Sequence, residues 1–407
     1  MHPLLKNVKS SLKSYRLRER YGELCRLVRW KADYSEGVIF SDDHLFELTA
    51  NLPRTRVVKE AEVVQTSQIP ICLPVDEKVE FQPQISFFTN YLIDSEDAEE
   101  FYFANCYLFL GKYFFYERNH EKKDQAAKQG FRNLLFHKSL DDRWTIDRYQ
   151  NKYAPLPGDV KNNQRPLISL SNNCNENYFH WMHFPSLINY STVKRREPEL
   201  LSECDFYLGS SYDKKLPNYM QEMLTKLKIP KTRLHYSPLR SARMLSCFQF
   251  TNDVWISPIH LKFLRKSFLP EGDLKNYPKR IFISREDTPG RRLLNESAIF
   301  DMLKCDYGFE KVVLSDETFQ KQINCFSQAE LIVGAHGAGF SNITFANKNC
   351  VLIELFSKNH IGTHFLKMSE VLGIRYGYVI GDPITSSSDS HFSVDVSKLK
   401  RLMGSFL

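Results

Sequence analysis

The sequence predicts an α/β protein with two Rossmann-like lobes, preceded by a mixed α+β extension. Its 407 residues are too many for one ordinary hydrophobic core and suit two or three domains. A hydrophobic fraction of 42% with 25% charged residues is typical of a globular protein. From about residue 165 onward, short apolar runs alternate with helical patterns in two successive series. This alternation predicts parallel sheets with helices on both faces.

The two series define the expected elements. Strands are expected at 167–170, 205–208, 280–283, 311–314, 331–333 and 351–354, and helices at 177–190, 218–227, 297–303, 318–325 and 342–346. Ligands of open α/β sheets bind at the carboxyl ends of the strands. The ligand site is therefore expected in a cleft between the two lobes.

The domain boundaries follow from these patterns. We expect a basic amphipathic helix at 1–33, an N-terminal region at 34–245 that includes an α/β lobe at 165–245, a second lobe at 246–385, and a closing helix at 386–407. The closing helix is expected to pack back across the lobes, because Val396, Leu399 and Leu402 recur at helical spacing. Short β-like runs around 57–64 and 84–88 suggest strands in the extension.

Charge and cysteine usage limit the compartment and the partners. Residues 1–31 hold nine Lys or Arg against two Glu, so this helix either lies on an anionic membrane surface or packs on the protein. No nucleic-acid motif accompanies the charge, so nucleic acid is not expected as a partner. The nine cysteines form no C-x-x-C pair, and no apolar run suits a signal peptide or a membrane span. A cytoplasmic protein is expected, with contact to the inner face of the cell membrane as one reading.

A glycine-rich turn follows the expected strand at 331–333. Its glycines allow a sharp turn and a close approach of the backbone to a ligand. Gly337, Ala338 and Gly339 are expected to wrap phosphates with main-chain N–H groups, and His336 to donate to an oxygen. The alternative is a turn that needs glycine for geometry alone. The turn lacks the G-K-[ST] of a P-loop and the spacing of a dinucleotide fingerprint.

Arginines and acidic residues provide the other expected ligand contacts. Arg285 follows a strand and Arg291 precedes a helix, so both are expected to bind phosphate oxygens. Asn295 and Glu296 either orient these arginines or cap the helix, and a cap is favoured for Asn295. Glu354 ends an apolar strand and is expected to accept the hydroxyls of a ribose.

These motifs resemble those of glycosyltransferase family 61. The resemblance rests on the segments 283–285, 291–296, 308–309, 334–339 and 353–355, with the upstream run Asn177-Tyr-Phe-His180-Trp181, and covers roughly residues 165–380. It implies a GT-B-like fold with an acceptor side in the N-terminal region and a donor site in the second lobe. It also implies transfer of a sugar from a nucleotide-diphosphate sugar to a glycan or lipid-linked glycan, in the synthesis of a bacterial surface polysaccharide. The nucleotide-sugar is a substrate, and no further cofactor is expected.

The upstream run is expected to serve the acceptor. His180 is the candidate general base, with inversion at the anomeric carbon, and Asn177 and Trp181 are expected to contact the acceptor. The alternative for His180 is a core histidine bonded to a carbonyl. Residues 205–407 contain no D-x-D motif, so no metal is expected.

Two other classes of function are weighed. A non-catalytic protein on this fold would bind nucleotide or glycan without transfer. An esterase would explain the similarity of 336–339 to an oxyanion-hole motif, but it needs a G-x-S-x-G elbow, and Ser341 lacks the trailing glycine.

Overall fold

The structure is a computed structural model. It describes residues 55–65, 85–95, 101–104, 107–110 and 161–407, the last range with gaps at 171–176, 184, 209–215, 237–238, 242, 252–255, 272–273 and 275. The helix expected at 1–33 lies outside the described residues. Within the described part of the chain, no helix combines the length and the apolar character that a membrane crossing requires.

The sheet nearer the C-terminus, here called the second sheet, confirms the predicted α/β class. Its order is β12-β11-β13-β14-β15-β16, and every neighbouring pair from β12 to β15 is parallel. All residues of β13 and β14 are buried, as expected for parallel strands covered on both faces. The strands are β11 (Arg280–Ser284), β12 (Glu310–Val313), β13 (Leu331–Ala335), β14 (Val351–Ser357), β15 (Arg375–Pro383) and β16 (Phe392–Ser393).

The first sheet is mixed, which corrects the prediction of a parallel sheet. Its order is β1-β2-β10-β6-β7-β8; the strands from β10 to β8 are parallel, whereas β1 and β10 both run antiparallel to β2. Strands β1 and β2, which make the antiparallel pairs, precede the alternating series, and antiparallel pairing needs no crossover helix. The strands are β1 (Thr55–Gln65), β2 (Ile85–Ser95), β6 (Leu167–Ser169), β7 (Asp205–Tyr207), β8 (Leu234–His235) and β10 (Met244–Thr251).

A smaller sheet of four strands accompanies the first sheet. Its order is β4-β3-β9-β5, and it joins three strands that precede the first α/β lobe to β9 of that lobe. The strands are β3 (Phe101–Ala104), β4 (Tyr107–Leu110), β5 (Lys161–Asn163) and β9 (Leu239–Ser241).

The helix expected at 177–190 is two helices. The first, α6 (Tyr178–His183), ends before α7 (Pro185–Arg196), which begins at a proline. Proline has no N–H and suits the first turn of a helix, so a new helix starts there. The other helices of this part are α8 (Asn218–Lys226) and α9 (Pro258–Phe268), and the Ser257 side chain caps α9 by accepting from His260 N.

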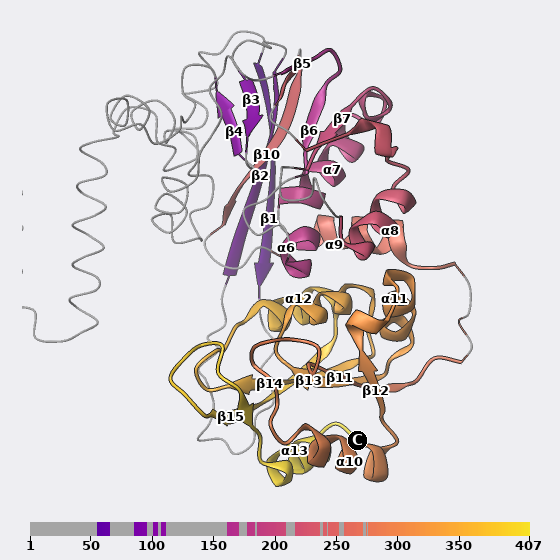
Figure 1. Cartoon of the computed structure of the whole chain (residues 1–407), viewed down its shortest axis with the longest axis vertical. Helices are drawn as coiled ribbons and strands as arrows, with labels where there is room; N and C mark the ends of the chain where they lie inside the picture. Colours follow the sequence, from indigo (N-terminus) through magenta and orange to yellow (C-terminus); the bar gives the residue numbers. More distant parts are fainter. Residues whose placement is uncertain are drawn as a thin grey trace, which may run out of the picture.

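The helices of the second sheet lie on its two faces. The face toward the first sheet carries α11 (Phe319–Gln328), α12 (His364–Leu372) and the 3₁₀ helix η8 (Ala338–Phe345), and the far face carries α10 (Glu296–Tyr307) and α13 (Val396–Met403) (Figure 1). The closing helix α13 packs on α10 and β15. It therefore covers the far face of the second sheet, which corrects the expectation that it packs across both lobes.

Candidate active site

A cavity of about 930 Å³ opens where β11 and β13 end and α6 and α8 approach them. This is the carboxyl edge of the parallel strands, the expected place for a ligand. Its lining combines the glycine-rich turn, the segment that carries Arg285 and Arg291, and the helices α6 and α8. The lining residues are Asn177, Tyr178, Tyr219, Ile283, Ser284, Arg285, Asp287, Thr288, Pro289, Gly290, Arg291, Leu314, Ser315, Gln322, Ala335, Gly337, Ala338, Gly339, Phe340 and Asp389.

Arg285 brings a partly buried cation into this cavity. Its Nη2 donates to Gly290 O over 3.2 Å, while its Nε is buried and makes no hydrogen bond. Burial, with the neighbouring Arg291, lowers the pKa of Arg285 to about 10, so it remains charged at neutral pH. A buried donor left without a partner is unfavourable. The guanidinium group as a whole offers its charge to an anion in the cavity.

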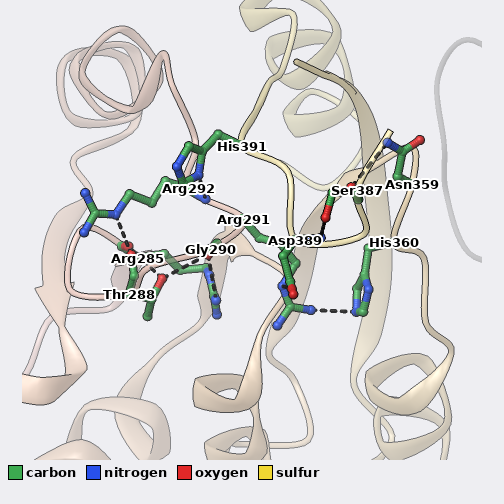
Figure 2. A network of polar contacts seen from close by, with 10 residues as sticks. All are labelled: Arg285, Thr288, Gly290, Arg291, Arg292, Asn359, His360, Ser387, Asp389 and His391. Atoms are coloured by element: carbon green, nitrogen blue, oxygen red, sulfur yellow. Dashed lines mark hydrogen bonds and ion pairs between the residues drawn. The ribbon is translucent and has the colours of Figure 1, made fainter. Parts of the chain in front are cut away.

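Arg291 lies beside Arg285 in an unusual backbone conformation. Its φ of 55° falls in the left-handed region, which a residue with a side chain rarely adopts. Its backbone N–H donates to Asp389 O over 3.0 Å, which holds the turn in place. Its Nε is also buried without a hydrogen bond, and lies 3.7 Å from Asp389 Oδ1. The two arginines therefore line one cavity, and each has a buried Nε without a hydrogen bond. Figure 2 shows both side chains.

His360 positions the guanidinium of Arg291. Arg291 Nη1 donates to His360 Nε2 over 2.6 Å, so that nitrogen accepts and the imidazole is neutral. Burial and Arg291 lower the pKa of His360 to about 4, which keeps it neutral near pH 7. Sequence reasoning did not single out His360, because a lone histidine after a strand carries no motif.

The glycine at 337 is needed for space. Its φ of 176° is extended backbone that any residue adopts, but a Cβ there would overlap the guanidinium of Arg285. At Gly334 a Cβ would lie 2.7 Å from Ile283 O, so that position is closed by backbone. The glycine therefore lets the guanidinium of Arg285 lie directly against the main chain at the start of η8.

The start of η8 lines the cavity through Gly337, Ala338, Gly339 and Phe340. Phe340 N is the amide that closes the first turn, onto Gly337 O at 3.0 Å. The amides before it have no partner within the helix, as at any helix N-terminus. Further along, Asn342 accepts from Tyr178 Oη at 2.6 Å and donates to Gln322 at 2.9 Å, which ties η8 to α6 and α11.

Glu354 does not line the cavity. It is fully buried in β14, where one oxygen contacts His336 Nδ1 and the other accepts from Tyr376 Oη at 2.5 Å. Burial raises the pKa of Glu354 to about 8. Burial, with Arg291 and Arg285, lowers the pKa of His336 to about 3. Both directions favour a neutral pair, with the proton on the carboxyl group and Nδ1 as acceptor.

This pair fixes the tautomer of His336. With Nδ1 accepting, the proton of the neutral ring is on Nε2, which can then donate. His336 itself lies just outside the cavity lining, between the lining residues Ala335 and Gly337. Glu354 thus holds His336 in place, and it does not line the cavity in which its contact with a ribose is expected.

The upstream run divides between cavity and core. Asn177 lines the cavity. Trp181 is fully buried, and its Nε1 contacts Met223 Sδ at 3.2 Å, so it does not reach an acceptor in this structure. His180 is half-buried and outside the lining; burial and His364 lower its pKa to about 4.

Asn295 and Glu296 also lie away from the cavity. The Asn295 amide pairs with the backbone of Val394, donating over 2.7 Å and accepting over 3.2 Å, and makes no cap hydrogen bond although it precedes α10. Glu296 accepts from Ser284 Oγ at 2.6 Å and pairs with Lys311 at 2.9 Å. The hydrogen bonds and the ion pair of these two side chains connect neighbouring segments of the chain. None of them is made to Arg285 or Arg291.

Several lining residues were missed by sequence reasoning. Tyr178 and Tyr219 meet edge to face with ring centroids 5.0 Å apart, and Gln322, Asp287 and Asp389 add polar groups. The tyrosines could have been found only from their place beside His180 and in the helix at 218–227. The aspartates stand in loops without a pattern.

Two other chemistries find no support in this region. Within the described residues, no group of His, Cys, Asp and Glu side chains is arranged to hold a metal ion. Ser341, which an esterase would use in the glycine-rich segment, is fully buried.

Part of the chain is similar to known proteins. Residues 178–353 match the family model Glycosyltransferase 61. A stretch of 117 residues, 24% of this chain, is 27% identical to a β-1,2-xylosyltransferase of Arabidopsis thaliana. It covers 22% of that relative, so the chain spans about a fifth of its length. The matched range includes Arg285, Arg291 and the glycine-rich turn at 334–339. This chain therefore contains a domain of the glycosyltransferase 61 family.

Proposed function

We propose that the cavity binds a nucleotide-diphosphate sugar and that the domain transfers the sugar to a hydroxyl group of a glycan acceptor. The observation that carries this proposal is the pair of guanidinium groups of Arg285 and Arg291, which line one cavity together with the start of η8. Planar guanidinium groups match phosphate oxygens, and a diphosphate offers enough of them for both.

The leaving group defines what the site has to do. When the acceptor oxygen bonds to the anomeric carbon, the bond from that carbon to the β-phosphate oxygen breaks, and the diphosphate takes the electron pair. Arg285, Arg291 and the amides at the start of η8 can stabilise the added charge, which is larger in the transition state than in the donor. We therefore propose that transfer needs no metal ion and inverts the anomeric carbon.

His180 is our candidate for the base that takes the acceptor proton. It stands on α6 outside the cavity lining, so this role requires that α6 turns its side chain toward the acceptor during transfer. Its lowered pKa leaves it neutral and able to accept a proton at pH 7. Asn177, Tyr178 and Tyr219 form the acceptor side, because tyrosine rings and amides suit the faces and hydroxyls of sugars.

The name of the plant relative suggests which donor to test first. UDP-xylose is the first choice, with UDP-glucose, GDP-mannose and CMP-sialic acid as comparisons. A GT-B-like arrangement of two lobes, a role in a bacterial surface polysaccharide, a cytoplasmic site of action and contact of residues 1–31 with anionic lipid remain parts of this proposal. Vesicle binding by the chain with and without residues 1–31 tests the last of these.

The decisive experiment joins binding and turnover. Donor binding is measured by calorimetry, and transfer to a panel of glycans by mass spectrometry. We expect Arg285→Ala to weaken donor binding about 10- to 100-fold, the usual effect of losing a charge-assisted hydrogen bond. The control is Lys279→Ala. Lys279 is a cation that precedes β11, at the end of the strand opposite Arg285, and it lies outside the cavity. Donor binding without transfer to any glycan would favour the non-catalytic alternative.

A further inference from the structure

The cavity that carries the two arginines also carries a carboxylate against them. Asp389 lines the cavity, and its Oδ1 lies 3.7 Å from Arg291 Nε. Its side chain is 75% exposed, so it remains hydrated and can move aside at small cost. Sequence reasoning assigned no role to Asp389, and the transfer reaction described above does not use it.

The loop that carries Asp389 is held in place by hydrogen bonds. Arg291 N donates to Asp389 O at 3.0 Å, Arg292 N to His391 Nδ1 at 3.2 Å, and Asn359 Nδ2 to Thr385 O at 2.7 Å. Figure 2 shows Asp389 beside Arg291, with Arg292 and His391 and the bond from Asn359 to Ser387 O nearby. The backbone of the loop is therefore held next to the proposed diphosphate site, while the exposed carboxylate of Asp389 keeps some freedom.

The charges of the lining are balanced. Arg285 and Arg291 are its cations, and Asp287 and Asp389 are its anions; no other Lys, Arg, Asp or Glu lines the cavity among the described residues. The site that has to attract a diphosphate thus carries two formal negative charges of its own. Both carboxylates weaken the attraction between the site and an anionic ligand.

Ligand charge explains what a carboxylate achieves there. The diphosphate of a nucleotide-sugar is esterified at both ends and carries about two negative charges. A free nucleoside diphosphate carries about one more, because the second pKa of a terminal phosphate is near 6, and a nucleoside triphosphate carries about two more. The extra charge sits at the end where the sugar was attached.

We propose that Asp389 determines specificity by charge: it disfavours nucleotides that end in a free phosphate, and so selects the sugar donor over the nucleoside diphosphate product and over nucleoside triphosphates. This inference rests on the proposed function. Two arginines bind the two charges of the donor, and Asp389 repels the additional charge of the product. Release of the product is then assisted by the same residue.

The test compares Asp389→Asn with the wild type in binding UDP-xylose, UDP and UTP by calorimetry. Asparagine keeps the size and the backbone contacts of the loop. We expect the affinity for UDP to rise about three- to tenfold more than that for UDP-xylose, and the affinity for UTP to rise further, since repulsion grows with ligand charge and falls with salt. Asp301→Asn on α10, on the far face of the second sheet, makes the same change in net charge and is the control.

A pH series separates charge selection from a structural role. In the wild type, the ratio of UDP to UDP-xylose affinity should fall as pH rises through about 6, where the terminal phosphate loses its second proton. In Asp389→Asn this fall should be smaller. Equal changes for all three ligands, or weaker binding of all, would overturn the inference and leave Asp389 as a support of Arg291. If neither protein binds any of the three, the proposed function fails together with the inference.

Discussion

At the residue scale, Glu354 shows that burial can decide the charge of a side chain. Its carboxyl group is fully buried between His336 and Tyr376, and its pKa is raised to about 8. A protonated carboxyl has the hydrogen-bonding pattern of an amide: one donor for His336 and one acceptor for Tyr376. We therefore expect Glu354→Gln to fold with a nearly unchanged free energy of unfolding. Glu354→Ala should lower the free energy of unfolding by about 2–4 kcal/mol, because it leaves both partners without a hydrogen bond and creates an empty space in the core.

The effect of Glu354→Gln on the free energy of unfolding should depend on pH. The folded pKa lies above the ordinary value of 4.5, so the stability that Glu354 contributes is complete below about pH 4.5 and is lost as pH rises to about 8. Gln does not titrate. Urea unfolding at about pH 5 and about pH 8 should show the Gln variant gaining stability relative to the wild type at the higher pH. If Glu354 instead holds a ribose as a carboxylate, the Gln variant will lose donor affinity.

His180 is tested by its pH profile. An imidazole of pKa about 4 is a weak base, so we expect His180→Ala to lower turnover by about 10²-fold, the lower end for general acid–base catalysis. The neutral form is the active one, so wild-type turnover should be level from about pH 5 to about pH 8 and fall only toward pH 4. A limb near the ordinary histidine pKa of 6.5, or a mutant with normal turnover, would assign the proton to another group.

At the scale of elements, the buried strands could be predicted from their runs of apolar residues. The strands expected at 280–283 and 331–333 are β11 and β13, because apolar runs bounded by polar residues suit buried parallel strands. The helix expected at 342–346 is part of η8, which starts at Ala338. Five buried residues cannot distinguish a period of 3.0 from one of 3.6.

Side-chain direction could not be predicted. Residues two apart on a helix point about 200° from one another, so α6 cannot turn both Tyr178 and His180 into the cavity. On β14 both faces are covered, so a carboxylate at the end of an apolar run gives no sign of exposure. Arg285 and the glycine-rich turn were predictable because their backbone positions alone, at the ends of β11 and β13, bring them together.

The glycine at 337 links the geometry of η8 to binding. An Ala Cβ would displace the end of the Arg285 side chain and leave the backbone in place. We expect Gly337→Ala to weaken donor binding about 10- to 100-fold while the unfolding free energy changes by less than about 1 kcal/mol. Calorimetry and thermal unfolding measure the two effects. Gly404→Ala, where a Cβ makes only ordinary contacts, is the matched control, and equal donor binding by both variants would separate Gly337 from Arg285.

At the scale of the whole molecule, the two sheets share their cores. Phe345 of η8 and Phe319 of α11 pack in the cluster of the first sheet, while Phe179 of α6 packs in a cluster of the second. Polar contacts cross the same boundary: Arg265 of α9 donates to Thr344 O at 2.6 Å and to Ala346 O at 2.9 Å. Two lobes joined only by a hinge would have separate cores. This packing favours one cooperative unit in the described part of the chain.

Phe345 provides the test of that unit. Its ring lies 6.1 Å from Phe319 and 6.4 Å from Phe268, and its side chain is 1% exposed. Phe345→Leu removes part of this aromatic contact, so we expect a loss of about 1–3 kcal/mol. Phe345 lies on η8, which covers the second sheet, but it packs in the core of the first. Calorimetry should therefore show one transition at a lower temperature.

Phe300→Leu on α10 is the comparison, since Phe300 packs with the far-face core of the second sheet. In one cooperative unit, both substitutions shift the same single transition. Two separate transitions, of which Phe345→Leu moves one and leaves the other in place, would show that the sheets unfold independently. The cavity between α6, α8 and the second sheet would then depend on a mobile boundary, and donor binding would be expected to raise the temperature of only one transition.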